Sequence, residues 1–193
     1  MDKDIIFELY RKESTVFTLK EITLLFPNLS YKTIINKLVY AVKIGQLKKV
    51  RRGIYVKDDF DFLELVNRLY TPSYISFETV LQKEGIIFQV YKTVFAASYL
   101  TRNIKLKENE IFYRKIKNEI LLNKKGVEKI NNYFIATKER AFLDAIFLYK
   151  NYHIDNLKSL NWEKIMELKK IYQSKIFEKR IDEYYQIFKE EYV

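Results

Sequence analysis

Apolar residues recur at helical spacing in three segments near the start of the chain. The first segment spans residues 4–12, and the second spans residues 19–26 behind Thr18, a residue type suited to cap a helix. Pro27 ends the second segment, because proline cannot continue the hydrogen bonding of a helix. In the third segment the apolar residues again share one face, and they are Ile34, Ile35, Leu38, Ala41 and Val42. The pattern therefore predicts three short helices.

The third predicted helix has both ends marked in the sequence. Ser30 can cap its N-terminus through its hydroxyl oxygen, and Gly45 permits the left-handed conformation that often follows a C-terminus. Residues 47–50 and 54–56 are then typical of short strands, with Arg51-Arg52-Gly53 as the turn between them. Three helices followed by a hairpin predict a winged helix-turn-helix.

The remainder of the chain mixes helical and strand patterns. Asp58 or Asp59 can cap a helix that runs to Leu69, and a short helix is predicted from Ser76 to Glu84. Strands are then predicted over residues 90–99, 104–106, 110–116, 119–122 and 130–136. Helices are predicted to begin at residues 137–140 and to span residues 161–172 and 174–190. The aromatic residues of the C-terminal helices are expected to form a packing stripe, with a surface for a partner as the alternative: Tyr172, Phe177, Tyr184, Tyr185 and Phe188.

These elements predict an α+β protein of two domains. Residues 1–57 are expected to form the winged helix-turn-helix. Residues 58–193 are expected to form a larger mixed domain with a mostly antiparallel sheet and C-terminal helices.

The net charge of +10 is concentrated in one part of the chain. Residues 14–57 hold nine Lys or Arg against one acid, a net charge of +8, whereas residues 151–193 hold eight of each sign. A surplus on one helix face and one hairpin is the electrostatic footprint of a surface that binds a polyanion. Lysine is common throughout the chain, however, and some winged helices bind only protein, so RNA and protein remain alternatives to duplex DNA.

The polar face of the third helix carries both kinds of DNA-contacting side chain. Lysines and arginines can contact phosphates, whereas Asn36 can bond an adenine through its N6 and N7 edge. Because the two features coincide, double-stranded DNA is the favoured partner. The predicted DNA-binding residues are Ser30, Tyr31, Lys32, Thr33, Asn36, Lys37, Tyr40, Lys43, Lys48, Lys49, Arg51 and Arg52.

The sequence offers little for catalysis and predicts no enzyme, cofactor or metal site. His153 is the only histidine and there is no cysteine, so neither a zinc cluster nor a Cys-His pair is expected. The four glycines are isolated, which excludes a P-loop and a dinucleotide-binding fingerprint. Asp58, Asp59 and Asp61 could hold a divalent ion, as in a nuclease, but they lie where a helix needs a cap.

Targeting signals are also missing from the sequence. The N-terminus lacks the pattern of a signal peptide, and no run of 18 apolar residues occurs. A cysteine-free chain fits a reducing compartment. The prediction is a cytoplasmic protein without a membrane partner.

Three short motifs occur in a characteristic order. They are Arg52-Gly53-Ile54-Tyr55, Tyr74-Ile75-Ser76, and Ile135 to Asp144 with the sequence IATKERAFLD. In this order the chain resembles the AbiEi-type antitoxins of type IV abortive-infection toxin-antitoxin systems. The resemblance implies a winged helix that represses transcription by binding repeats in its own operon promoter. It also implies a second domain that counters a nucleotidyltransferase-like toxin in phage defence, without requiring a stable complex with that toxin.

Within the third motif we interpret residues 139–144 as a structural signature, with Glu139 at a helix cap. The alternative function is a regulator that senses a ligand or binds a protein through its second domain and is unrelated to a toxin. A second basic patch is also conceivable there, although a solvated strand face explains the same residues: Arg114, Lys115, Lys117, Lys124 and Lys125.

Overall fold

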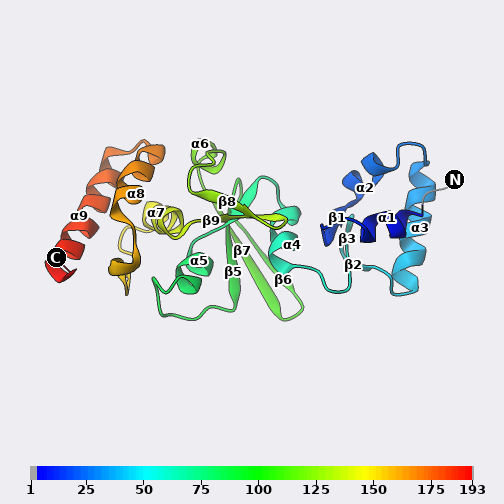
Figure 1. Ribbon diagram of the computed structural model, residues 1–193, viewed down its shortest axis with the longest axis horizontal. Helices are drawn as coiled ribbons and strands as arrows, with labels where there is room; N and C mark the ends of the chain where they lie inside the picture. The colour runs from blue at the N-terminus through cyan, green and yellow to red at the C-terminus, as the bar shows by residue number, and fades with distance from the viewer. Residues whose placement is uncertain (1–3, 193) are drawn as a thin grey trace. The chain divides into compact units, whose positions relative to one another are not determined.

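The chain has an α+β fold. A computed structural model describes residues 4–192, which divide into two compact units after Leu69 (Figure 1). The boundary expected after Lys57 therefore lies inside the first unit. Helix α4 (Phe62–Leu69) belongs to that unit because the Glu64 carboxylate accepts hydrogen bonds from the Thr15 amide at 2.9 Å and the Thr15 hydroxyl at 2.7 Å.

Helices and a small sheet alternate in the first unit. Its elements in order are α1 (Ile5–Tyr10), β1 (Val16–Thr18), α2 (Leu19–Leu25), α3 (Tyr31–Lys43), β2 (Lys48–Arg51), β3 (Ile54–Val56) and α4. The three strands pair antiparallel in the order β1-β3-β2. Strand β1 was not predicted, because its partner β3 lies far along the chain and no short turn marks their pairing as one marks the β2–β3 hairpin.

The helix ends of the first unit follow the predicted residue types. Thr18 accepts from the Glu21 amide in a reciprocal capping box, and Ser30 accepts from the Thr33 amide at 3.1 Å. Gly45 follows α3 with a φ of +77°, as expected. The cap of α4 was predicted wrongly: Asp61, rather than Asp58 or Asp59, accepts from the Leu63 amide at 2.8 Å.

One hydrophobic core holds α1, α2, α3 and the hairpin together. Its buried members are Ile5, Leu9, Phe17, Ile22, Phe26, Ile34, Leu38, Ala41, Leu47 and Tyr55. The burial of Ile34, Leu38 and Ala41 confirms the apolar face predicted for the third helix.

The second unit is built on a six-stranded sheet. Its elements in order are β4 (Ser73–Ile75), α5 (Glu78–Lys83), β5 (Thr93–Ser98), β6 (Arg102–Leu106), β7 (Asn109–Lys115), α6 (Asn118–Leu121), β8 (Val127–Ile130), β9 (Tyr133–Ala136), α7 (Lys138–Leu148), α8 (Trp162–Leu168) and α9 (Lys175–Tyr192), with 3-10 turns at Leu157–Ser159 and Lys169–Tyr172. The strand order is β6-β7-β5-β4-β9-β8.

The sheet is mixed in direction. Pairs β6-β7, β5-β4 and β9-β8 are antiparallel, whereas β7-β5 and β4-β9 are parallel. The strand predicted over residues 119–122 is instead the short helix α6. There the Leu121 amide bonds to the Lys117 carbonyl at 2.9 Å, so the short apolar run folds locally.

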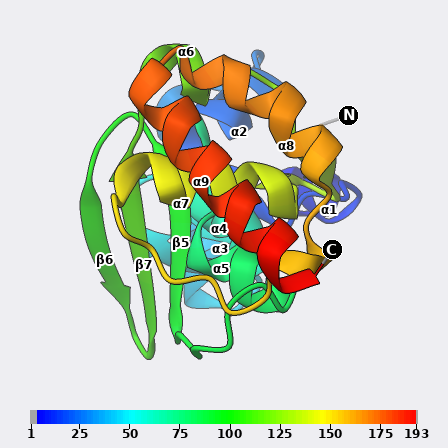
Figure 2. The same cartoon turned by 90° about the vertical axis from the view of Figure 1, so that its left-hand side faces the viewer.

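Helices cover one face of this sheet in two layers. Helices α5 and α7 lie against the strands, and α8 and α9 pack on the outer side of α7 (Figures 1 and 2). The aromatic side chains of α9 join this packing, since the Tyr184 ring meets Phe142 edge-on and Tyr185 and Phe188 lie against Trp162. Within residues 4–192 no helix is both long enough and apolar enough to cross a membrane.

Candidate nucleic-acid interface

Helix α3 exposes one continuous stripe of side chains opposite its buried face. Lys32, Asn36, Val39 and Lys43 are all exposed, and at 100° per residue they lie within about 60° of one another. Tyr40 is 62% exposed beside this stripe. The centre of the exposed face therefore lies closer to Val39 than the sequence interpretation placed it. Val39 was not among the predicted DNA-binding residues, yet it is 56% exposed. Its place in the series Lys32, Asn36, Val39 and Lys43, spaced i, i+4, i+7 and i+11, could have predicted this.

Two residues predicted to contact DNA, Ser30 and Thr33, lie at the N-terminus of α3 and form its cap. The hydroxyl oxygens of Ser30 and Thr33 are 2.8 Å apart and hydrogen bonded to each other. Ser30 also accepts from the backbone of Thr33, so these two side chains fix the helix end. Tyr31, which is 61% exposed, lies near Tyr55, whose pKa is raised first by burial and then by Tyr31.

The β2–β3 turn presents the second group of predicted residues. Lys48, Lys49, Arg51 and Arg52 are all exposed there. Gly53 has a φ of +76°, which favours glycine, and its carbonyl accepts from the Leu19 amide at 2.8 Å. This bond ties the turn to the first residue of α2, so its cationic tip is held in a defined place.

An acid at the base of the hairpin pairs with one of these lysines. The Lys48 ammonium group forms an ion pair with the Asp58 carboxylate and also lies 3.4 Å from the Asp58 carbonyl oxygen. The hydrogen bond from Lys48, followed by its charge, lowers the pKa of Asp58. Asp58 thus serves a basic side chain and not the helix cap or ion site considered from the sequence.

One residue of the basic surplus is not on the surface. Lys57 is only 8% exposed, and its ammonium group donates to the carbonyl oxygens of Lys12 at 2.6 Å and Tyr10 at 3.4 Å. The same group lies over the rings of Tyr10 and Phe17. Lys57 therefore links the end of β3 to the end of α1, and its ammonium group is not available to a phosphate.

The second basic patch considered for the larger domain does not form as a set. Arg114 is buried and makes a bidentate ion pair with Glu78, with one N–O distance of 2.9 Å. Its guanidinium lies 4.3 Å from the ring centre of Phe95 and 5.0 Å from that of Tyr149. Lys125 pairs with Glu167 at 3.3 Å.

Two of the three motifs behind the family resemblance meet in one buried polar network. Asp144 accepts from Arg140 at 3.2 Å, Tyr172 at 2.6 Å, Tyr74 at 3.0 Å and Ser76 at 2.8 Å. Arg140 and Asp144 are fully buried, and Arg140 also donates to the carbonyl oxygens of residues 120 and 125. Burial and the Asp144 charge raise the pKa values of Tyr74 and Tyr172, so both phenols remain protonated donors.

The N-cap of α7 also differs from the one expected. Thr137 caps the helix by accepting from the Arg140 amide at 3.3 Å, whereas Glu139 lies buried in the first turn and accepts from the Asn161 amide at 3.3 Å. These contacts explain why the motif residues are close in space: they join β4, α7 and the helices that follow.

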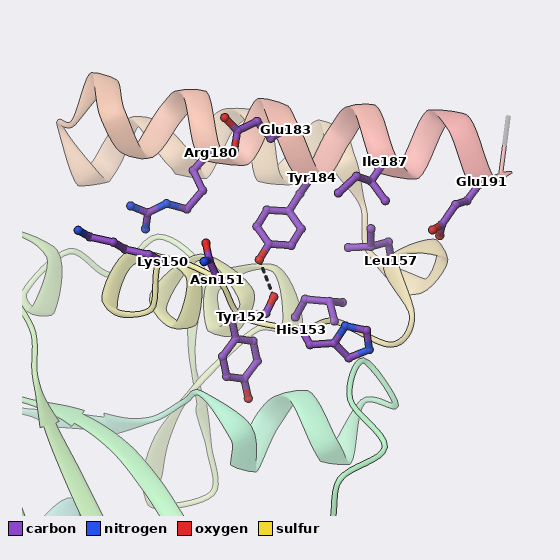
Figure 3. A pocket seen from close by; sticks show the side chains of 11 residues that line it. Lys150, Asn151, Tyr152, His153, Leu157, Arg180, Glu183, Tyr184, Ile187 and Glu191 are labelled. Carbon is purple, nitrogen blue, oxygen red and sulfur yellow. Dashed lines mark hydrogen bonds between the residues drawn. The ribbon is translucent and has the colours of Figure 1, made fainter.

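A cavity of about 500 Å³ lies between α9 and the loop after α7 (Figure 3). Two polar side chains along it already have backbone partners: Arg180 donates to the Ile146 carbonyl at 2.6 Å, and Tyr184 donates to the Tyr152 carbonyl at 2.5 Å. His153 is 87% exposed at its edge, and its Nε2 lies 3.2 Å from Asp155. In residues 4–192 no three histidine or acidic side chains converge as metal ligands would.

Comparison with known proteins does not assign a family. A scan against protein-family models finds no match, and no curated protein is significantly similar to the chain. The function therefore has to be inferred from the geometry of the first unit and from the chemistry of its residues.

Proposed function

We propose that the chain is a sequence-specific DNA-binding repressor whose first unit acts as a winged helix-turn-helix. The observation that carries this proposal is the exposed stripe of α3 together with the cationic β2–β3 turn. The element order, with α3 following α2 across a short turn and the hairpin following α3, is consistent with that domain type. In this function α3 lies in the major groove and the turn contacts the flanking backbone.

The proposed roles divide between reading bases and holding phosphates. Asn36 is exposed at the centre of α3, where its amide can bond adenine. Lys32 and Lys43, eleven residues apart, are separated by roughly 16 Å along the helix, so each can contact a phosphate near its own end of α3. Lys49, Arg51 and Arg52 extend the backbone contacts.

The biological role that we propose is that of an AbiEi-type antitoxin and transcriptional autorepressor. In this role the protein works in the cytoplasm, binds repeats in its own promoter and counteracts a nucleotidyltransferase-like toxin in a type IV abortive-infection system. The order of the three motifs supports this assignment, as does the buried network that unites Tyr74 and Ser76 with Arg140 and Asp144. The proposed activity needs no catalytic group or cofactor.

The test is binding of the purified chain to its own upstream promoter and to a scrambled duplex of equal length, at about 50 and 200 mM salt. We expect a preference for the promoter that survives the higher salt. Equal binding that collapses with salt would contradict specific repression. The Asn36→Ala change should weaken promoter binding about 5- to 100-fold and scrambled binding little, whereas Arg51→Ala should weaken both.

Rescue from the toxin is tested separately. Co-expression with the neighbouring toxin gene should restore growth, and the Asn36→Ala variant should still do so, because antitoxicity is assigned to the second unit. Loss of rescue in a well-folded Asn36→Ala variant would contradict this division of labour.

A second candidate function is a ligand-responsive regulator, favoured by the cavity beside α9. Its volume of about 500 Å³ lies within the range of small-molecule sites. A metabolite that changes promoter affinity or raises the unfolding temperature of the second unit would support this function over the antitoxin role.

A further inference from the structure

Val39 differs from every other residue of the exposed stripe of α3. Lys32, Asn36 and Lys43 each present a charged or amide group, whereas Val39 presents two methyl groups and is 56% exposed. It is not among the hydrophobic side chains that pack on the core of the first unit. Its χ1 angle is restrained in a helix, so the methyl groups have a fixed direction. An apolar knob thus stands in the middle of a basic face.

The major groove contains one apolar group that such a knob fits. Among the base edges only thymine carries a methyl group there, at C5, and small aliphatic side chains discriminate thymine by contacting it. We propose that Val39 contacts a thymine C5-methyl group and so selects a thymine in the operator. This inference rests on the proposed function and deepens it, because it names the base that one residue recognises.

The position of that thymine follows from helix geometry. Val39 is three residues from Asn36, which corresponds to about 4.5 Å along the axis, whereas neighbouring base pairs are about 3.4 Å apart. Both side chains point outward from the same stripe. The thymine contacted by Val39 therefore lies one or two base pairs from the adenine assigned to Asn36.

The basic surroundings decide between DNA and another partner for Val39. Lysines occupy both ends of the stripe, and residues 14–57 as a whole carry a net charge of +8. An apolar protein surface or a membrane interior would leave those lysines without counter-charges, whereas a duplex places phosphates beside both of them. We therefore assign the apolar group to the groove.

The experiment begins with selection of binding sites from a random duplex library by the full-length protein. Each thymine of the selected site is then replaced by deoxyuridine, which lacks only the C5-methyl group. At one or two positions the replacement should weaken wild-type binding about fourfold, the effect of one buried methyl group. In the Val39→Ala variant the same replacement should have no further effect, because the contact is already lost.

Val90→Ala is the matched control, because Val90 is 78% exposed in the second unit and its change should leave the deoxyuridine effect intact. Folding is not expected to obscure the result, since alanine favours a helix more than valine does. The inference is overturned if no thymine is sensitive, if Val39→Ala remains sensitive, or if Val39→Ala changes the oligomeric mass and so assigns the residue to a protein interface. Failure to select any sequence would overturn the proposed function as well.

Discussion

In the first unit Lys32, Lys43, Lys49 and Arg52 are exposed, whereas in the second unit Arg114 and Arg140 are buried against Glu78 and Asp144. Both groups look alike in the sequence, as basic residues among apolar ones. The difference teaches that a basic residue indicates a polyanion partner only when the fold leaves its charged group exposed. Arg140 donates to Asp144, to Tyr74 and to the carbonyl oxygens of residues 120 and 125, whereas the side chains of Lys49 and Arg52 are exposed to solvent.

The buried network gives the largest expected effect. Replacing Asp144 by Asn leaves the guanidinium of Arg140 without its counter-charge and should destabilise the second unit by about 3–5 kcal/mol. Trp162, the single tryptophan of the chain, lies in this unit, so denaturant unfolding followed by its fluorescence measures the change. Asp182→Asn is the control: its ion pair with Lys169 is partly exposed, and its loss should cost at most about 1 kcal/mol. Equal effects would refute the distinction between buried and exposed charge.

Two lysines of the first unit, one buried and one exposed, allow the same comparison of buried with exposed charge. Lys57→Met should destabilise that unit by about 1.5–3 kcal/mol, because the buried ammonium bonds to the Lys12 and Tyr10 carbonyls are lost. It should leave the salt dependence of DNA binding unchanged. Lys49→Met should do the reverse, with little effect on unfolding and a slope of log K against log salt reduced by about 0.9. Thermal circular dichroism and binding titrations measure the two quantities, and a reduced slope for Lys57→Met would contradict its assigned role.

Alanine substitutions at two glycines, Gly126 and Gly85, measure how tightly the residues around Arg140 are packed. A Cβ at Gly126 would lie 2.9 Å from the Cβ of Arg140 and 3.1 Å from Leu168, whereas a Cβ at Gly85 meets nothing within 4 Å. Both glycines have positive φ, so both alanine variants carry the same backbone strain of roughly 1–2 kcal/mol. Gly126→Ala should cost about 1–3 kcal/mol more than Gly85→Ala in Trp162-monitored unfolding. Equal costs would show that the network yields easily.

The smallest effect concerns the acid that pairs with Lys48. Asp58→Asn removes this ion pair and should raise the affinity for any duplex a few-fold, with a slope steeper by up to about 0.9, since Lys48 can then contact a phosphate. Asp59→Asn removes an equal charge one residue away and reports the long-range contribution alone. If both variants gain affinity equally, the Lys48–Asp58 pair does not limit DNA binding.

Features that depend on near neighbours could be predicted from the sequence. The caps at Thr18 and Ser30 need only the next turn of helix, and Gly45 needs only its own backbone angles. The apolar stripe of α3 has the helical period, which determines its buried face before any partner is known. For the same reason the α+β class and most of the helices were predicted.

Features that depend on distant partners were decided by the tertiary structure. Strand β1 exists because Val16 pairs with Val56. Lys57 is buried because the carbonyl oxygens of Lys12 and Tyr10, 45 and 47 residues earlier, accept hydrogen bonds from its ammonium group. Arg114 does not belong to the basic patch considered from the sequence, because it is paired with Glu78, 36 residues away. The sequence alone determined which side chains carry charge and which helix faces are apolar; only the fold decided which charges reach solvent, because a charge leaves water only where a distant acid or carbonyl group compensates it.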